Sequence, residues 1–165
     1  MKATAQKKLF DLMKEQNPNI KDIEKLISDG VDLHCRNEQG RTPLLQLLCN
    51  SASKQNVQQI VGLFVQNGAE LNAKDNNGSN CIHWLCCSYR GSDLKDVTRL
   101  LLQNEFDANA KTNNAYNALQ FLCTSYKGNV MIDIVRLLIE NGVDFNGKKA
   151  RDYLISNYQG VHKNI

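Results

Sequence analysis

The chain has 165 residues, 42% of them hydrophobic, which is about the size and apolar content of one domain with a continuous core. Its 20 basic and 17 acidic residues leave a net charge of +3, too small to indicate a nucleic acid or an anionic membrane as the partner. No apolar run approaches the ~18 residues of a membrane-spanning helix. Residues 1–8 have no apolar signal-peptide core behind them. We therefore expect a cytoplasmic protein, with the nucleus as a second compartment, and no membrane contact.

The first predicted elements are two helices, over residues 7–15 and 20–28, joined by Asn17-Pro18-Asn19. The outer face of the first helix is charged along its length, at Lys7, Lys8, Asp11, Lys14 and Glu15. A polar outer face is typical of the terminal unit of a stacked array, because that face has no neighbour to cover it. The pair is therefore predicted to cap the N-terminal end.

A short sequence motif that follows this pair is repeated along the chain. Asp29-Gly30-Val31-Asp32-Leu33 has counterparts whose glycine position falls at residues 68, 105 and 142, in steps of 38, 37 and 37 residues. A fixed period of this length indicates stacked supersecondary units that cannot bury their apolar faces alone. Such arrays present a long surface, so we expect binding and not catalysis.

Each later unit opens with a polar turn, at residues 37–41, 75–79 and 112–116, predicted to form short β-hairpin turns. A first helix follows each turn, with Thr42, Asn80 and Asn117 at the N-cap position. The bodies of these helices are apolar almost all round, as expected for helices packed between neighbours.

A second helix completes each unit, over residues 57–66, 94–103 and 131–140. Each second helix is expected to end at a residue in the left-handed conformation. This position is occupied by Gly68, Glu105 and Gly142. A side chain at Glu105 is expected to cost roughly 1 kcal/mol of backbone strain.

The phrases Gly40-Arg41-Thr42-Pro43-Leu44 and Gly68-Ala69-Glu70-Leu71-Asn72-Ala73, with the helix pair between them, resemble the ankyrin repeat. Later copies depart from it, with Asn80-Cys81-Ile82-His83 in place of Thr-Pro-Leu-His. The resemblance implies an all-α helical solenoid of four helix pairs. Its units are expected at residues 4–35, 36–73, 74–110 and 111–147, with a partial C-terminal cap at 148–160. It also implies that His83 forms a hydrogen bond between adjacent units.

The period exceeds the ~33 residues of an ordinary ankyrin repeat. The surplus lies between the two helices of each unit, at residues 51–56, 88–93 and 125–130. These enlarged loops are predicted to form a row along one edge of the solenoid.

The segment Cys81–Cys87, with three thiols and His83, is the one place that suggests a zinc site or a thiol enzyme. The core interpretation is stronger, because the cysteine positions follow the repeat period and small thiols suit contacts between stacked helices. We expect reduced cysteines, no metal, no cofactor and no catalytic residue.

The resemblance places partner binding on the turn tips and on the exposed face of the first helices. The helix positions are Cys49-Asn50, Cys87-Ser88 and Thr124-Ser125. The expected tip residues are Glu38, Gln39, Arg41, Asn76, Asn77, Ser79, Asn113, Asn114 and Tyr116. The enlarged loops add Tyr89, Arg90, Tyr126 and Lys127, from a phrase that recurs after 37 residues. Tyrosine and arginine often carry interface energy, but Tyr89 and Tyr126 could instead pin their loops to the neighbouring unit.

The functional prediction is a non-catalytic module that binds a protein or peptide, acting as a monomer, with an inhibitor or adaptor as one form of it. No small-molecule substrate is expected. The alternative is a nucleic-acid sensor that uses Arg90, Lys127, Lys148, Lys149 and Arg151.

Overall fold

The computed structural model describes residues 2–52, 54–104, 106–125 and 131–143, and within them it contains eight α-helices and no β-strand. The helices are α1 (Lys2–Lys14), α2 (Ile20–Ser28), α3 (Pro43–Cys49), α4 (Val57–Gln66), α5 (Cys81–Ser88), α6 (Leu94–Leu102), α7 (Ala118–Ser125) and α8 (Met131–Glu140). They confirm the predicted all-α solenoid of four helix pairs. The predicted cap at 148–160 lies outside the described residues.

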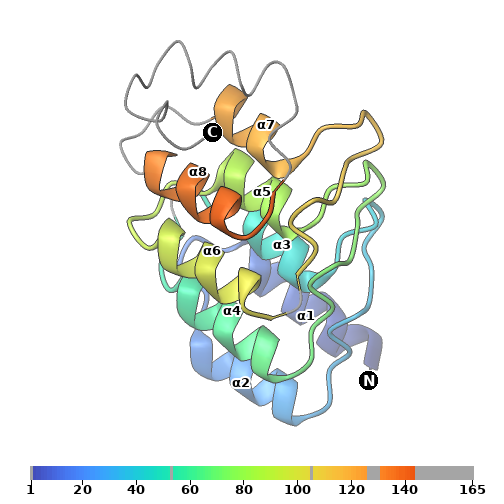
Figure 1. Ribbon diagram of the computed structural model, residues 1–165. Coiled ribbons are helices and arrows are strands. Elements are labelled where there is room, and N and C mark those ends of the chain that lie inside the picture. The colour runs from blue at the N-terminus through green and yellow to red at the C-terminus, as the bar shows by residue number, and fades with distance from the viewer. Residues whose placement is uncertain (1, 53, 105, 126–130, 144–165) are drawn as a thin grey trace, which may run out of the picture.

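The helices form two rows stacked in chain order (Figure 1). In the inner row, α1, α3, α5 and α7 each pack on the next, and in the outer row α4 packs on α6 and α6 on α8. One apolar core runs between the rows, with α3 and α4 contributing side chains such as Leu44, Leu47, Ile60 and Phe64 that are fully buried. Each unit therefore buries its apolar face against its neighbours.

The helix starts follow the predicted caps. Thr42 Oγ1 accepts a hydrogen bond from the Leu45 N–H at 3.3 Å, and Pro43 occupies the first helical position, where an N–H is not needed. Asn117 Oδ1 likewise accepts from the Gln120 N–H at 3.0 Å. The exception is α1, which begins at Lys2, five residues before the prediction. Alanine and unbranched side chains at residues 3, 5 and 6 favour that extension.

The predicted turns are present, although no strand flanks them in the described residues. Each is closed by a backbone hydrogen bond, as between the Asn37 N–H and the Arg41 carbonyl at 3.0 Å. Neighbouring turns are also linked, because the Asn76 N–H donates to the Gln39 carbonyl at 3.0 Å. Gly40 has a φ of +72°, and a Cβ there would lie 2.2 Å from Asn76 Oδ1. Glycine thus permits both the left-handed turn and the close stacking.

The outer-row helices end as predicted at left-handed glycines, with φ of 77° at Gly30 and 76° at Gly68 and Gly142. At Gly68 the next residue closes the motif, since the Ala69 N–H donates to the Phe64 carbonyl at 2.9 Å. Glu105, the predicted exception, lies outside the described residues.

Candidate interaction surface

The turn tips present six of the predicted contact residues to solvent: Glu38, Gln39, Asn76, Asn77, Asn113 and Asn114. Two of the asparagine side chains also hold the stack together. Asn76 Nδ2 donates to the Glu38 carbonyl, and Asn113 Nδ2 donates to the Asn76 carbonyl, both at 3.0 Å. The exposed amides of Asn77 and Asn114 therefore sit on a row of tips that is already ordered. Ser79 is different, because only 5% of its surface is exposed.

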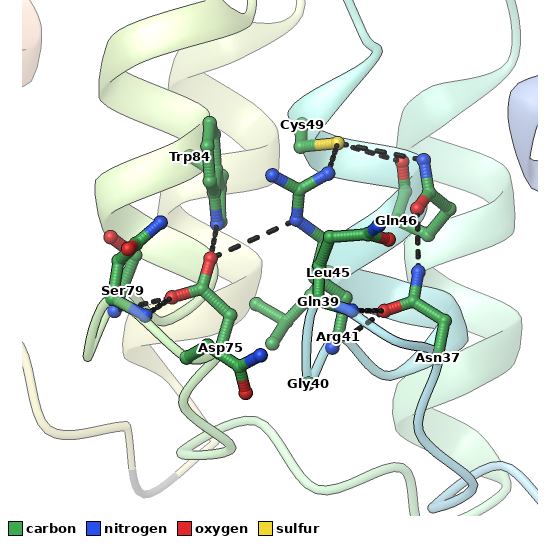
Figure 2. A network of polar contacts seen from close by, with 12 residues as sticks. Asn37, Gln39, Gly40, Arg41, Leu45, Gln46, Cys49, Asp75, Ser79 and Trp84 are labelled. Atoms are coloured by element: carbon green, nitrogen blue, oxygen red, sulfur yellow. Dashed lines mark hydrogen bonds and ion pairs between the residues drawn. The ribbon is translucent and has the colours of Figure 1, made fainter.

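Beside the tips, a buried carboxylate organises the turn of the third unit (Figure 2). Asp75 Oδ1 accepts from the backbone N–H groups of Asn77 and Ser79 at 2.9 and 3.0 Å, which explains why Ser79 faces inward. Its Oδ2 accepts from Trp84 Nε1 at 3.0 Å. The carboxylate thus ties the turn to α5.

Arg41, another predicted contact residue, extends this network across the boundary between two units. Its guanidinium lies 4.6 Å from the centre of the Trp84 ring, and its Nε is 3.8 Å from Asp75 Oδ2. Its NH1 donates to Cys49 Sγ at 3.1 Å. The Arg41 side chain is 19% exposed. The cation is therefore held in place over an indole, an arrangement whose attraction is largest when both groups are shielded from water.

The same arrangement varies from unit to unit. In the second unit, Asn37 replaces the aspartate and donates through Nδ2 to Gln46 Oε1 at 2.9 Å. In the fourth unit, the rings of Tyr116 and Phe121 meet edge to face with centroids 6.0 Å apart. Trp84, Tyr116 and Phe121 are all half-buried. Trp84 and Phe121 also pack against the core, as expected for the bodies of the first helices.

His83 joins the third and fourth units, which confirms its predicted role. Its Nε2 donates to the Tyr116 carbonyl at 3.1 Å, while Nδ1 lies 3.3 Å from the backbone nitrogen of Asn80 and 2.5 Å from Asn80 Oδ1. Burial lowers the pKa of His83, an effect that nearby Lys74 reinforces and the hydrogen bond to Tyr116 and the charge of Asp75 oppose. The imidazole is a neutral structural link with 1% exposure.

The enlarged loop after α5 corrects one expectation. Tyr89 is 1% exposed, its hydroxyl bonds to Asp93, and burial raises its pKa. Its ring also packs against Gly91, where a Cβ would lie 2.2 Å from the Tyr89 hydroxyl. Tyr89 is thus placed as a loop anchor, the alternative noted above, and not as a contact residue. Its counterpart Tyr126, with Lys127, lies outside the described residues.

A cleft of about 620 Å³ lies where the inner helices α1, α3 and α5 end. It is lined by Lys14, Gln16, Cys49, Asn50, Ala52, Cys87, Ser88 and Arg90. Six of these are residues that the sequence placed on the binding face or in the enlarged loops. Lys14 and Gln16 were missed, because only the packing of α1 on α3 brings them to the same place.

The cysteine segment lies mainly in the core. Cys81 and Cys86 are fully buried, and burial raises the pKa of Cys81 to about 12. A thiol with so high a pKa is a poor nucleophile. The described residues contain no group of three or more side chains placed to hold a metal ion. Within the same part of the chain, no helix is long and apolar enough to cross a membrane.

Comparison with known proteins agrees with the geometry. The sequence model described as "Ankyrin repeats (3 copies)" matches residues 48–149. A comparison with curated protein sequences gave no match. The matched residues cover more than half of the chain, and they include the turns of the third and fourth units, the helices α4 to α8 and the left-handed Gly68 and Gly142. The chain belongs to the ankyrin-repeat family.

Proposed function

We propose that this chain is a non-catalytic module that binds a protein partner through the turn tips and the exposed face of the inner helices. Ankyrin repeats are generally protein–protein interaction modules, and the family match supports the general class. The observation that carries the specific surface is the partly exposed pair of Arg41 and Trp84 beside the tip amides. Arginine and tryptophan are the residue types most often found at the energetic centre of an interface.

The surface suits a partner because it is ordered before binding. The tips are linked by hydrogen bonds from Asn76 and Asn113, and the Arg41 side chain is held by Asp75, Trp84 and Cys49. Fewer side chains then lose rotamer freedom when the partner docks, which reduces the entropic cost of association. By occupying its partner's surface, such a module would act as an inhibitor or an adaptor.

The test compares two triple variants that add the same charge at different places. Gln39→Arg, Asn77→Arg and Asn114→Arg alter the exposed tips, while Gln58→Arg, Gln59→Arg and Gln66→Arg alter exposed positions of α4 in the outer row. Affinity capture from native cell extract, quantified by mass spectrometry, is expected to lose its specific partner with the tip variant and keep it with the α4 variant. Equal capture by both variants would remove the tips from the proposed site.

A further inference from the structure

The cleft at the ends of α1, α3 and α5 has a chemistry different from that of the tips. We propose that it binds an extended acidic segment of the partner, with one carboxylate near Lys14 and a second near Arg90. This inference rests on the proposed protein-binding function and names the chemistry of part of the partner. It concerns the enlarged-loop edge of the solenoid and not the turn tips.

The charge of the lining carries the inference. Lys14 and Arg90 are cations and both are exposed, whereas no Asp or Glu is among the described residues that line the cleft. Of the carboxylates on adjoining segments, Asp93 binds Tyr89 and Asp11 pairs with Lys14 at 3.2 Å, while Glu15 is exposed next to Lys14 without lining the cleft. The Asp11–Lys14 pair is more than half exposed and therefore weak, so Lys14 can exchange it for a carboxylate of the partner.

At two of the three helices, α1 and α5, cations donate to carbonyl groups at or just beyond the negative helix end. Arg90 donates through NH1 and NH2 to the carbonyls of Tyr89 and Cys87, both at 2.7 Å. Lys54 is 5% exposed and donates through Nζ to the Glu15 carbonyl just beyond α1. Helix carbonyls would otherwise repel an anion at this edge. With those carbonyls bonded, the cleft presents cationic and neutral groups.

The walls are held by the enlarged loops. The Gln55 N–H donates to the Gln16 carbonyl at 3.2 Å, which fixes the loop after α3 against the end of α1. Tyr89 anchors the loop after α5 from below through Asp93. The longer loops also add Ala52 and Arg90 to the lining of the cleft.

The spacing of the cations sets the length of the occupant. Lys14 ends α1 and Arg90 follows α5, with α3 between them, so the backbone segments that carry them stand two helix-packing distances apart, or about 16–20 Å. An extended chain covers this distance in about five or six residues. Between the cations, the exposed Asn50 side chain offers an amide to a peptide backbone, and its Oδ1 accepts from the Cys49 thiol at 3.4 Å.

The experiment uses the full chain and three fluorescein-labelled peptides of Gly and Ser, measured by fluorescence anisotropy at low salt. One peptide carries two Glu residues five positions apart, one carries them two positions apart, and one has Gln at the five-residue spacing. We expect the first to bind about three- to tenfold more tightly than either of the others. Equal binding of all three peptides would overturn the proposal.

Charge reversal locates the site. The double variant Lys14→Glu with Arg90→Glu should reduce binding of the first peptide to the level of the Gln peptide. The control Lys21→Glu with Lys25→Glu makes the same change in net charge on exposed positions of α2 and should bind like the wild type. An equal loss in the control would mean that only diffuse charge is sensed. Because Arg90 also caps α5, the single variant Lys14→Glu, with its fold checked by circular dichroism, should still lose part of the affinity.

Two further outcomes separate the alternatives. A single-stranded oligonucleotide that binds more tightly than the acidic peptide, and loses binding in the same double variant, would overturn the proposal in favour of a nucleic acid. If the double variant leaves partner capture unchanged while the tip variant abolishes it, the acidic-segment inference fails and the proposed function stands.

Discussion

At the scale of single residues, Asp75 shows how one side chain is matched to its surroundings. Its carboxylate is 1% exposed and accepts three hydrogen bonds, from two backbone N–H groups and from Trp84, besides facing Arg41. An acceptor-only group suits a site where every neighbour is a donor. In the preceding unit, Asn37 fills the same position because its neighbour Gln46 offers an acceptor, so an amide is needed there.

This matching predicts a coupling between Asp75 and Trp84. Asp75→Asn should cost about 2–3 kcal/mol of unfolding free energy, because its amide would face the N–H groups of Trp84 and Arg41. Trp84→Gln should cost about 3 kcal/mol through lost packing. The double variant restores the Asn–Gln pair of the second unit and should lose at least about 1 kcal/mol less than the sum. Urea unfolding of the four proteins measures this, and additive losses would contradict the coupling.

At the scale of elements, the three turns differ at the position that closes them. Gly40 and Gly78 have φ of +72° and +76°, but the fourth unit places Ala115 there with φ of 61°. The side chain of an L-residue is strained in this region. The Gly78 site is also crowded, since a Cβ there would lie 2.6 Å from Asn113 Oδ1. The turns of the second and third units thus require glycine, both for space and for the left-handed conformation. The turn of the fourth unit instead has a strained alanine.

Opposite effects are therefore expected from exchanging these residues. Ala115→Gly should stabilise the protein by about 0.5–1 kcal/mol, because the relief of left-handed strain exceeds the added freedom of the unfolded chain. Gly78→Ala should destabilise it by about 2 kcal/mol or more, since strain and crowding add. Thermal and urea unfolding of both variants and the wild type measure these changes in stability. A destabilised Ala115→Gly variant would be inconsistent with strain at Ala115.

At the scale of the whole molecule, stability depends on the joints between successive units, since the helices of each row pack on their neighbours in the stack. The joint between the third and fourth units contains His83, which donates to Tyr116 across the boundary. In the next unit Gln120 occupies the equivalent position, and its Oε1 accepts from the Asn117 N–H at 2.9 Å. The glutamine forms the same kind of cap with a group that does not titrate.

Because of His83, the interface between the third and fourth units should make the free energy of unfolding decrease in mild acid. Burial holds the pKa of His83 below its ordinary value of 6.5, so below that pH the unfolded chain binds a proton that the folded state resists. Stability is therefore complete above pH 6.5 and falls as the pH decreases, by at most about 1.4 kcal/mol per pH unit. His83→Gln should flatten this dependence. Urea midpoints at three pH values between 7.5 and 5.5 test it, and an unchanged slope in the variant would exclude His83 as the cause.

The repeat, the helix pairs, the caps Thr42 and Asn117 and the left-handed helix ends were all predicted from the sequence, because each depends on residues close together in the chain. The resemblance to the ankyrin repeat also implied the link made by His83. Such local features can be predicted from the sequence because a helix end or a tight turn is specified by the few residues that form it.

Only the tertiary structure decided which of the candidate side chains face a partner. Tyr89 and Ser79 have polar groups typical of a contact surface, yet the loop and the turn fold over them. Trp84 packs against the core, as expected for the body of a first helix, and only the structure shows that it is also partly exposed beneath Arg41, a residue from the preceding unit. Lys14 and Arg90 are 76 positions apart and share a cleft because α1, α3 and α5 lie side by side. Whether a side chain is exposed, and which side chains lie next to it, depends on how the units stack. Stacking brings together residues that are far apart in the chain, and no local sequence pattern predicts such contacts.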